Sequence, residues 1–193
     1  MNNKWKLFYN PFEWIAGWKA FLIGIFIVCI TVLVGHVGNT YFYGIQIKHI
    51  PGISLLIAFL LQMTGLGITV LTMYLVSIIA AKGVRFQDIL GTVTLARYPF
   101  LLAALAGFLI TPKALNALLT ETKIDTQALI QFGVSGIIMI LVIILGVALL
   151  YNAFKVSTNI KGTKGIFLFI LIMIVSEIAT MIVVFNYSNL IIK

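Results

Sequence analysis

Charged residues are scarce in this chain. Only 9% of its 193 residues are Asp, Glu, Lys or Arg, whereas 62% are hydrophobic. A soluble domain carries roughly 25% charged residues, because it must cover its surface with solvated groups. The composition therefore excludes a water-soluble globular domain, and we expect a lipid bilayer to surround the chain. No polar linker divides the sequence, so we expect one membrane domain over residues 1–193.

Cysteine and histidine are almost absent. The single Cys29 lies inside an apolar run, which excludes an intrachain disulfide and a cysteine-based metal site. We interpret it as buried and inert, since a reactive thiol needs an exposed thiolate. His36 and His49 have no neighbouring cysteine or carboxylate, and we interpret them as membrane-interface residues rather than metal ligands. We expect no cofactor and no metal.

Acidic residues are outnumbered, five against 13 basic ones, which gives a net charge of +8. The basic residues stand one to three at a time between apolar runs and form no stripe, so nucleic acid is excluded as a partner. Catalytic signatures are missing as well: there is no H-E-x-x-H, G-x-S-x-G or phosphate-binding P-loop pattern, and no pair of intramembrane aspartates. An inverted repeat, common in secondary transporters, is not visible. We therefore expect no enzyme and no catalytic residue.

Five long apolar runs dominate what is present. About 20 apolar residues cross the 30 Å core of a bilayer as a helix. We therefore predict an all-α, polytopic membrane protein, a five-transmembrane-helix bundle. The predicted spans are residues 20–37, 53–81, 92–111, 131–154 and 166–184.

The segment before the first span is rich in aromatic residues and lysines. Asn10 and Pro11 form a helix start, with Glu13 placed to reach back to the cap. We interpret residues 5–19 as an interfacial N-terminal segment, because amphipathic aromatic rings settle at headgroup depth. A secretory signal peptide is disfavoured, since the apolar run starts late and no small-residue cleavage site follows.

The second span and the segment before it contain a few polar and small residues. We expect residues 41–43 to mark the far interface and residues up to Gly52 to form a loop. Gly65 and Gly67 interrupt the second span, which tilts or bends there. Gln62 is placed to hydrogen-bond a neighbouring helix.

The polar stretch at residues 82–98 is the most unusual part of the sequence. We predict a short surface helix over residues 86–95, on which Arg85 and Asp88 are spaced to pair. Tyr98 and Pro99 begin the third span. Pro99 removes an amide donor and leaves the carbonyl of Leu95 without its helical partner.

Arg97 has two interpretations near the membrane surface. It either donates to the Leu95 carbonyl or extends to lipid phosphates. Together with Tyr98 and Pro99 it forms a candidate docking site for a partner or a lipid headgroup on the cytoplasmic face. The alternative is an arginine that merely precedes a kinked helix.

Glu177 is the most conspicuous single residue. It lies 11 residues into the fifth predicted span, close to mid-bilayer at 1.5 Å per residue. A charged carboxylate is costly there unless it is protonated, paired or hydrated. It is either a proton or cation site, or a neutral Glu hydrogen-bonded to Gln62, Ser135 or Thr180. We expect no basic residue at its depth.

The distribution of lysine and arginine predicts orientation. One side carries nine: Lys4, Lys6, Lys19, Lys82, Arg85, Arg97, Lys155, Lys161 and Lys164. The other carries four: Lys48, Lys113, Lys123 and Lys193. By the positive-inside rule, the N-terminus is cytoplasmic and the C-terminus outside, in what we expect to be a bacterial cytoplasmic membrane.

Three short motifs resemble the YIP1 family of small membrane proteins. They are residues 10–12, the set 82–83, 86–90 and 98–99, and the set 151–157 and 161–164. The long N-terminal region and DLYGP-type motif of eukaryotic relatives are absent, and the compact form resembles the bacterial branch. The resemblance implies a non-enzymatic membrane protein, in some cases an accessory of ABC-type exporters.

Two functions are therefore open. The first is a scaffold or accessory subunit that binds other membrane proteins or its own copies through small-residue helix faces and basic loops. The second is a small transporter or lipid-handling protein that uses Glu177 and a polar path between spans.

Overall fold

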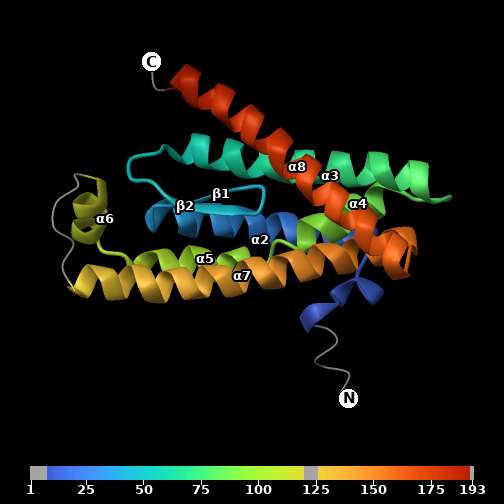
Figure 1. Cartoon of the computed structure of the whole chain (residues 1–193), viewed down its shortest axis with the longest axis horizontal. Helices are drawn as coiled ribbons and strands as arrows, with labels where there is room; N and C mark the ends of the chain where they lie inside the picture. Colours follow the sequence, from blue (N-terminus) through green and yellow to red (C-terminus); the bar gives the residue numbers. More distant parts are fainter. Residues whose placement is uncertain (1–7, 120–125, 192–193) are drawn as a thin grey trace.

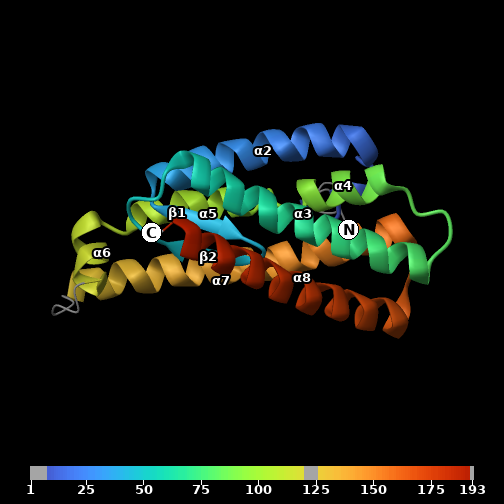
Figure 2. The ribbon, with the colours of Figure 1, turned by 90° about the horizontal axis from the view of Figure 1, so that it is seen from above.

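The computed structural model describes residues 8–119 and 126–191, and within them five helices are long and apolar enough to cross a membrane. They are α2 (Gly17–Val37), α3 (Leu55–Ala80), a composite third span (Phe86–Leu109), α7 (Thr126–Thr158) and α8 (Gly162–Ile191). The prediction of an all-α bundle with five spans is confirmed. Figures 1 and 2 show the spans side by side, and in the view of Figure 2 α2 and α8 lie near opposite edges of the bundle.

The third span lies at the centre of the bundle. It consists of α4 (Phe86–Leu95), α5 (Phe100–Ala106) and the 3₁₀ turn η2 (Gly107–Leu109). Within its most apolar window 72% of the residues are buried, against 22–33% in the other four spans. The other spans therefore form a shell around it, and they carry most of the lipid-facing surface.

The predicted helix over residues 86–95 is present as α4, but its predicted place on the surface is wrong. Most of α4 is buried, because small residues let it pack closely against α2. A Cβ added to Gly24 of α2 would lie 2.6 Å from the backbone nitrogen of Leu95. Such close approach of two backbones through small residues is how spans associate where no hydrophobic effect drives them together.

A short break separates α4 from α5 at Ala96–Pro99. The amide of Tyr98 donates to the carbonyl of Leu95 at 3.1 Å, and the amide of Phe100 donates to that of Arg97 at 3.0 Å. Pro99 gives the Leu95 carbonyl no i+4 donor, as predicted, but the substitute donor is the Tyr98 amide in a tighter 3₁₀-type turn and not the Arg97 side chain. Arg97 is left free to bond elsewhere.

A β-hairpin enters the bundle between α2 and α3. Its strands are β1 (Thr40–Tyr43) and β2 (Gln46–His49), paired antiparallel around a two-residue turn, Gly44–Ile45. Gly44 has φ 60°, the positive value that a type II′ turn requires at its first central position. The prediction that residues 41–43 mark the far interface is wrong, because all four residues of β1 are buried (Figure 1).

The two faces of the hairpin pack on different helices. Phe42 contacts the third span and α7, with its ring centroid 5.6 Å from that of Phe100. On the other face, Tyr41 packs in a cluster with Val32 of α2 and Ala58 of α3. The hairpin is therefore an inner layer of the bundle.

The remaining elements close the two ends of the bundle. The turn η1 (Pro11–Glu13) buries Phe12, and the Asn10 amide side chain donates to Glu13 at 2.8 Å. Residues 5–7 of the predicted interfacial segment lie outside the described residues. At the opposite end, α6 (Pro112–Leu119) leads toward α7.

Candidate functional site

Arg97 is buried in the middle of the third span. It is the twelfth of the 24 residues in Phe86–Leu109, and only 2% of its surface is exposed. One terminal nitrogen donates to the carbonyl of Gly44 in the hairpin turn, and the other donates to Thr69 Oγ1 of α3 at 3.1 Å. Both predicted positions, at the interface or extended to phosphates, are wrong, because the break in the third span directs this side chain inward to a free carbonyl.

Glu177 of α8 meets the other side of the same turn. Its Oε1 accepts a hydrogen bond from the amide of Ile45 at 2.8 Å, and the Gln46 side chain is a second hydrogen-bonding neighbour. Its side chain is half-buried. Arg97 and Glu177 attract each other electrostatically, so the expectation that Glu177 has no basic residue at its depth is wrong.

The partners predicted for Glu177 are engaged differently. Thr180 donates to the carbonyl of Ser176 at 2.7 Å, and Ser135 donates to that of Ala106 at 3.4 Å. Gln62 is buried on α3, and its amide nitrogen has no hydrogen-bond partner within the described part of the chain. Thr180 and Ser135 therefore bond the backbone of their own or an adjacent helix, whereas Glu177 bonds the hairpin.

The central feature of the site is one peptide group with a charged side chain at each end. The carbonyl of Gly44 and the amide of Ile45 belong to the same peptide unit, the central one of the turn. A two-residue hairpin leaves this unit outside its own ladder, and a buried peptide group without partners is costly. Arg97 supplies the donor and Glu177 the acceptor, so both ends of the peptide dipole meet an opposite charge.

Two glycines make room for this arrangement. A Cβ on Gly65 of α3 would fall on the backbone nitrogen of Gly44, and a Cβ on Gly44 would fall on the Glu177 carboxylate. Gly67, two residues further along α3, has open space around it. The helix α3 is continuous through both positions, so Gly65 provides close approach for the hairpin within an unbroken helix.

The charges of the site compensate each other within the membrane. An isolated charge at mid-bilayer is costly, and a cation and an anion around one dipole reduce that cost. The guanidinium also lies 5.4 Å from the centroid of the Phe100 ring, a favourable cation–π position. The arrangement anchors non-helical backbone at mid-membrane, and neutralising either charge leaves the other uncompensated.

The other predicted site residues lie apart from this centre. The Tyr98 hydroxyl donates to the carbonyl of Phe8, so it secures the N-terminal segment. Pro99 starts α5. Arg85 and Asp88, at the start of α4, form no ion pair with each other in the described structure, and at 1.5 Å per residue they lie about 14–18 Å along the span from Arg97.

The turn itself was not predicted, although a signal was present. Residues 40–49, TYFYGIQIKH, are rich in aromatic and β-branched residues around a central glycine. This composition is typical of two short strands joined by a tight turn. Thr69 gave no comparable signal, because threonines that bond their own helix backbone are common in spans.

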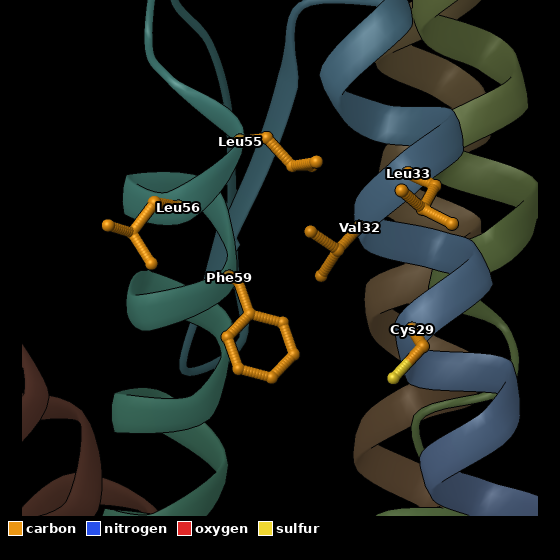
Figure 3. Close-up of a pocket in the computed structure, with 6 residues that line it drawn as sticks. All are labelled: Cys29, Val32, Leu33, Leu55, Leu56 and Phe59. Carbon is orange, nitrogen blue, oxygen red and sulfur yellow. The ribbon is translucent and has the colours of Figure 1, made fainter.

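An apolar groove of about 390 Å³ lies elsewhere, between α2 and α3. Figure 3 shows Cys29, Val32 and Leu33 of α2 across from side chains of α3. The α3 side is formed by Leu55, Leu56 and Phe59. Cys29 is half-buried in this apolar setting, which has no neighbouring base to activate a thiol.

Metal chemistry finds no support in the described ranges, which contain no group of three or more His, Cys, Asp or Glu side chains placed to hold a metal ion. Comparison of the chain with protein-family models, with curated proteins and with solved structures finds no match.

Proposed function

We propose that this chain is a non-enzymatic integral membrane protein that acts as a scaffold or accessory subunit for other membrane proteins. The observation that supports it is the use of the two intramembrane charges. Arg97 and Glu177 both hold the hairpin turn, and neither is reserved for a substrate. The YIP1 resemblance adds an ABC-type exporter as a partner class.

The outer faces of α7 and α8 are the surfaces best suited to a partner. Only 28% and 22% of their most apolar windows are buried, so most of each helix faces outward. Ile144 of α7 and Ile174 of α8 are more than half exposed. Such faces contact lipid or another span, and a scaffold uses part of them for the second purpose.

A native complex tests this proposal. The protein is extracted into lipid nanodiscs without detergent exchange, and we expect a stoichiometric complex with another membrane protein. Ile144→Trp and Ile174→Trp should reduce the amount of complex, because a bulky ring prevents close helix contact. Leu22→Trp, on the exposed face of α2 at the other edge of the bundle, is the matched control and should leave it intact. A chain that is always monomeric, or equal losses from all three variants, contradicts the proposal.

Transport through Glu177 is the second candidate, favoured because this carboxylate is only half-buried within a span. The Glu177→Gln variant separates the two functions in sealed proteoliposomes with an imposed pH gradient. Loss of a proton- or ion-dependent flux in a folded variant supports transport and contradicts the scaffold. A change in thermal stability, in a protein that carries no flux before or after substitution, supports the scaffold.

A further inference from the structure

We propose that the outer edge of β2 lines a water-filled cleft, which extends from the mouth of the hairpin inward to Glu177. The cleft would admit water and protons to mid-membrane from one side only. This inference is independent of the scaffold function, because a hydrated cleft is compatible with either function above.

The first observation is a row of backbone groups without partners. The register pairs Tyr43 with Gln46 and Tyr41 with Lys48, and the ladder continues where the Ile50 amide donates to the Asn39 carbonyl at 3.1 Å. Alternate residues of an antiparallel strand direct their amides and carbonyls away from the partner strand. On β2 these residues are Ile47 and His49, whose outward backbone groups bond to nothing in the described structure.

The second observation is that β2 is accessible whereas β1 is not. All four residues of β1 are buried, and the carbonyl of Thr40 lies so close to α2 that a Cβ on Gly35 would be 2.5 Å from it. On β2, by contrast, Lys48 is exposed and the other three residues are half-buried.

The third observation is the depth that β2 reaches in the membrane. Four residues of β2 extend about 13 Å at ~3.3 Å per residue, close to half of a hydrocarbon core of about 30 Å. The inner end bonds to Arg97 at the middle of the third span, so β2 crosses one half of the core. Non-helical backbone at such depth occurs only where it is buried in protein or lines a water-filled cavity. Because β2 is only partly buried and its outward backbone groups bond to nothing in the described structure, water is the remaining solvent for its edge.

The polar side chains along β2 agree with this conclusion. Gln46 lies beside Glu177 at the inner end, and Lys48 lies nearer the mouth, 5.2 Å from the ring centroid of Tyr43. Beyond the turn, the interior is apolar and closed by a buried cluster that includes Val70, Met73 and Ile89. Water therefore reaches Glu177 from the hairpin mouth and does not continue to the other face.

Labelling of single cysteines tests the cleft. Cys29→Ala provides the cysteine-free background. Gln46→Cys and Lys48→Cys place thiols near the inner end and near the mouth of β2, on the face that does not pack on the Phe42 cluster. Ile178→Cys, next to Glu177 and 54% exposed, is the control at equal depth toward lipid. A membrane-impermeant maleimide is added to one face of sealed membranes at a time. Since a thiol reacts as thiolate, which needs water, we expect labelling of the β2 cysteines at least about tenfold faster than of Ile178→Cys, and from one face only.

Size-exclusion chromatography of the labelled protein shows whether each variant is folded. If one β2 variant does not fold, the other decides the question. Rates as slow as that of Ile178→Cys for a folded β2 variant would overturn the proposal, and would mean that lipid or another protein covers this edge. Equal rates from both faces would also overturn it, because the buried cluster would then be open.

Discussion

At the scale of single residues, the structure depends on how one peptide group is hydrogen-bonded in the membrane. Neither Arg97 nor Glu177 is favourable there alone, and neither is the peptide unit of Gly44–Ile45. Together they form a closed set in which the carbonyl meets a cation and the amide meets an anion. Each group lowers the free-energy cost of burying the other two, so the loss of one destabilises all three.

Arg97→Met should strongly destabilise the protein. The substitution leaves the buried Gly44 carbonyl and the Thr69 hydroxyl without their donor and Glu177 without its nearby cation, and a buried polar group left without its partner costs about 1–3 kcal/mol. The thermal denaturation midpoint in detergent measures the loss. The double variant Arg97→Met/Glu177→Gln should lose less than the sum of the two single variants, because no uncompensated charge remains. Additive losses would show that the two side chains act independently.

His49 should make stability depend on pH. It lies at the mouth of the hairpin, outside the five spans, where burial lowers the pKa of its imidazole below 6.5, opposed by a contact with the Asn39 backbone. The unfolded chain therefore binds a proton more readily, and stability is complete above about pH 6.5 and declines as pH falls through that value toward the folded pKa. The denaturation midpoint of the wild type should fall more steeply with acidification than that of His49→Gln. Parallel curves for the two proteins would contradict this role.

At the scale of elements, α3 is the helix that receives the hairpin. Gly65 faces the turn at backbone contact and Thr69, one turn further, accepts from Arg97. Thr69 also donates to the carbonyl of Gly65 at 2.7 Å, which fixes its hydroxyl for that role. One face of α3 therefore sets the position of the turn.

Gly65→Ala should displace the hairpin, whereas Gly67→Ala should not. The added methyl at residue 65 falls on the Gly44 nitrogen, and at residue 67 it meets open space in the same helix. We expect a loss of about 1–3 kcal/mol for the first, typical of overpacking, and none for the second, since alanine favours a helix. Denaturation midpoints of the two variants check this. Equal effects would mean that the turn does not rest on residue 65.

The sequence predicted the positions of the spans better than it predicted which spans contact each other. The five spans follow directly from apolar length, which the bilayer requires of each helix separately. The placement of Arg97 and Glu177 on either side of the Gly44–Ile45 turn depends on which spans are adjacent, and hydropathy does not contain that information. The helix over 86–95 was predicted with the correct bounds but placed on the surface, because the charged residues Arg85 and Asp88 lie at its start. Its later residues, among them Ile89, Val93 and Leu95, face the bundle.

At the scale of the whole molecule, four spans surround a buried third span, and a hairpin lies inside the same bundle. Two small residues of the third span, Ala103 and Gly107, make room for the hairpin. Ala103 packs in the same cluster as Phe42, and a Cβ on Gly107 would fall on Thr40. Their four-residue spacing therefore accommodates the hairpin and not a partner helix. The bundle is organised from inside, and its apolar outer faces suit contact with lipid.

Five crossings predict that the two termini lie on opposite sides of a membrane. The excess of lysine and arginine on the loops that share a side with the N-terminus predicts that the N-terminus is cytoplasmic. Reporter fusions active only in the cytoplasm, or only outside it, should give opposite results at the two ends. The same result at both ends would contradict the five-span arrangement.

Amide hydrogen exchange of the unmodified protein in lipid nanodiscs tests the central claim, that a hairpin inside the membrane is held between two charges. If the claim holds, the amides of Tyr41, Tyr43 and Ile45 exchange as slowly as those within the spans, because two belong to the ladder and the third donates to Glu177. The connection at residues 159–161 should exchange quickly. Exchange of the three hairpin amides at the rate of that connection would show that residues 40–49 form an ordinary surface loop, and would contradict the account.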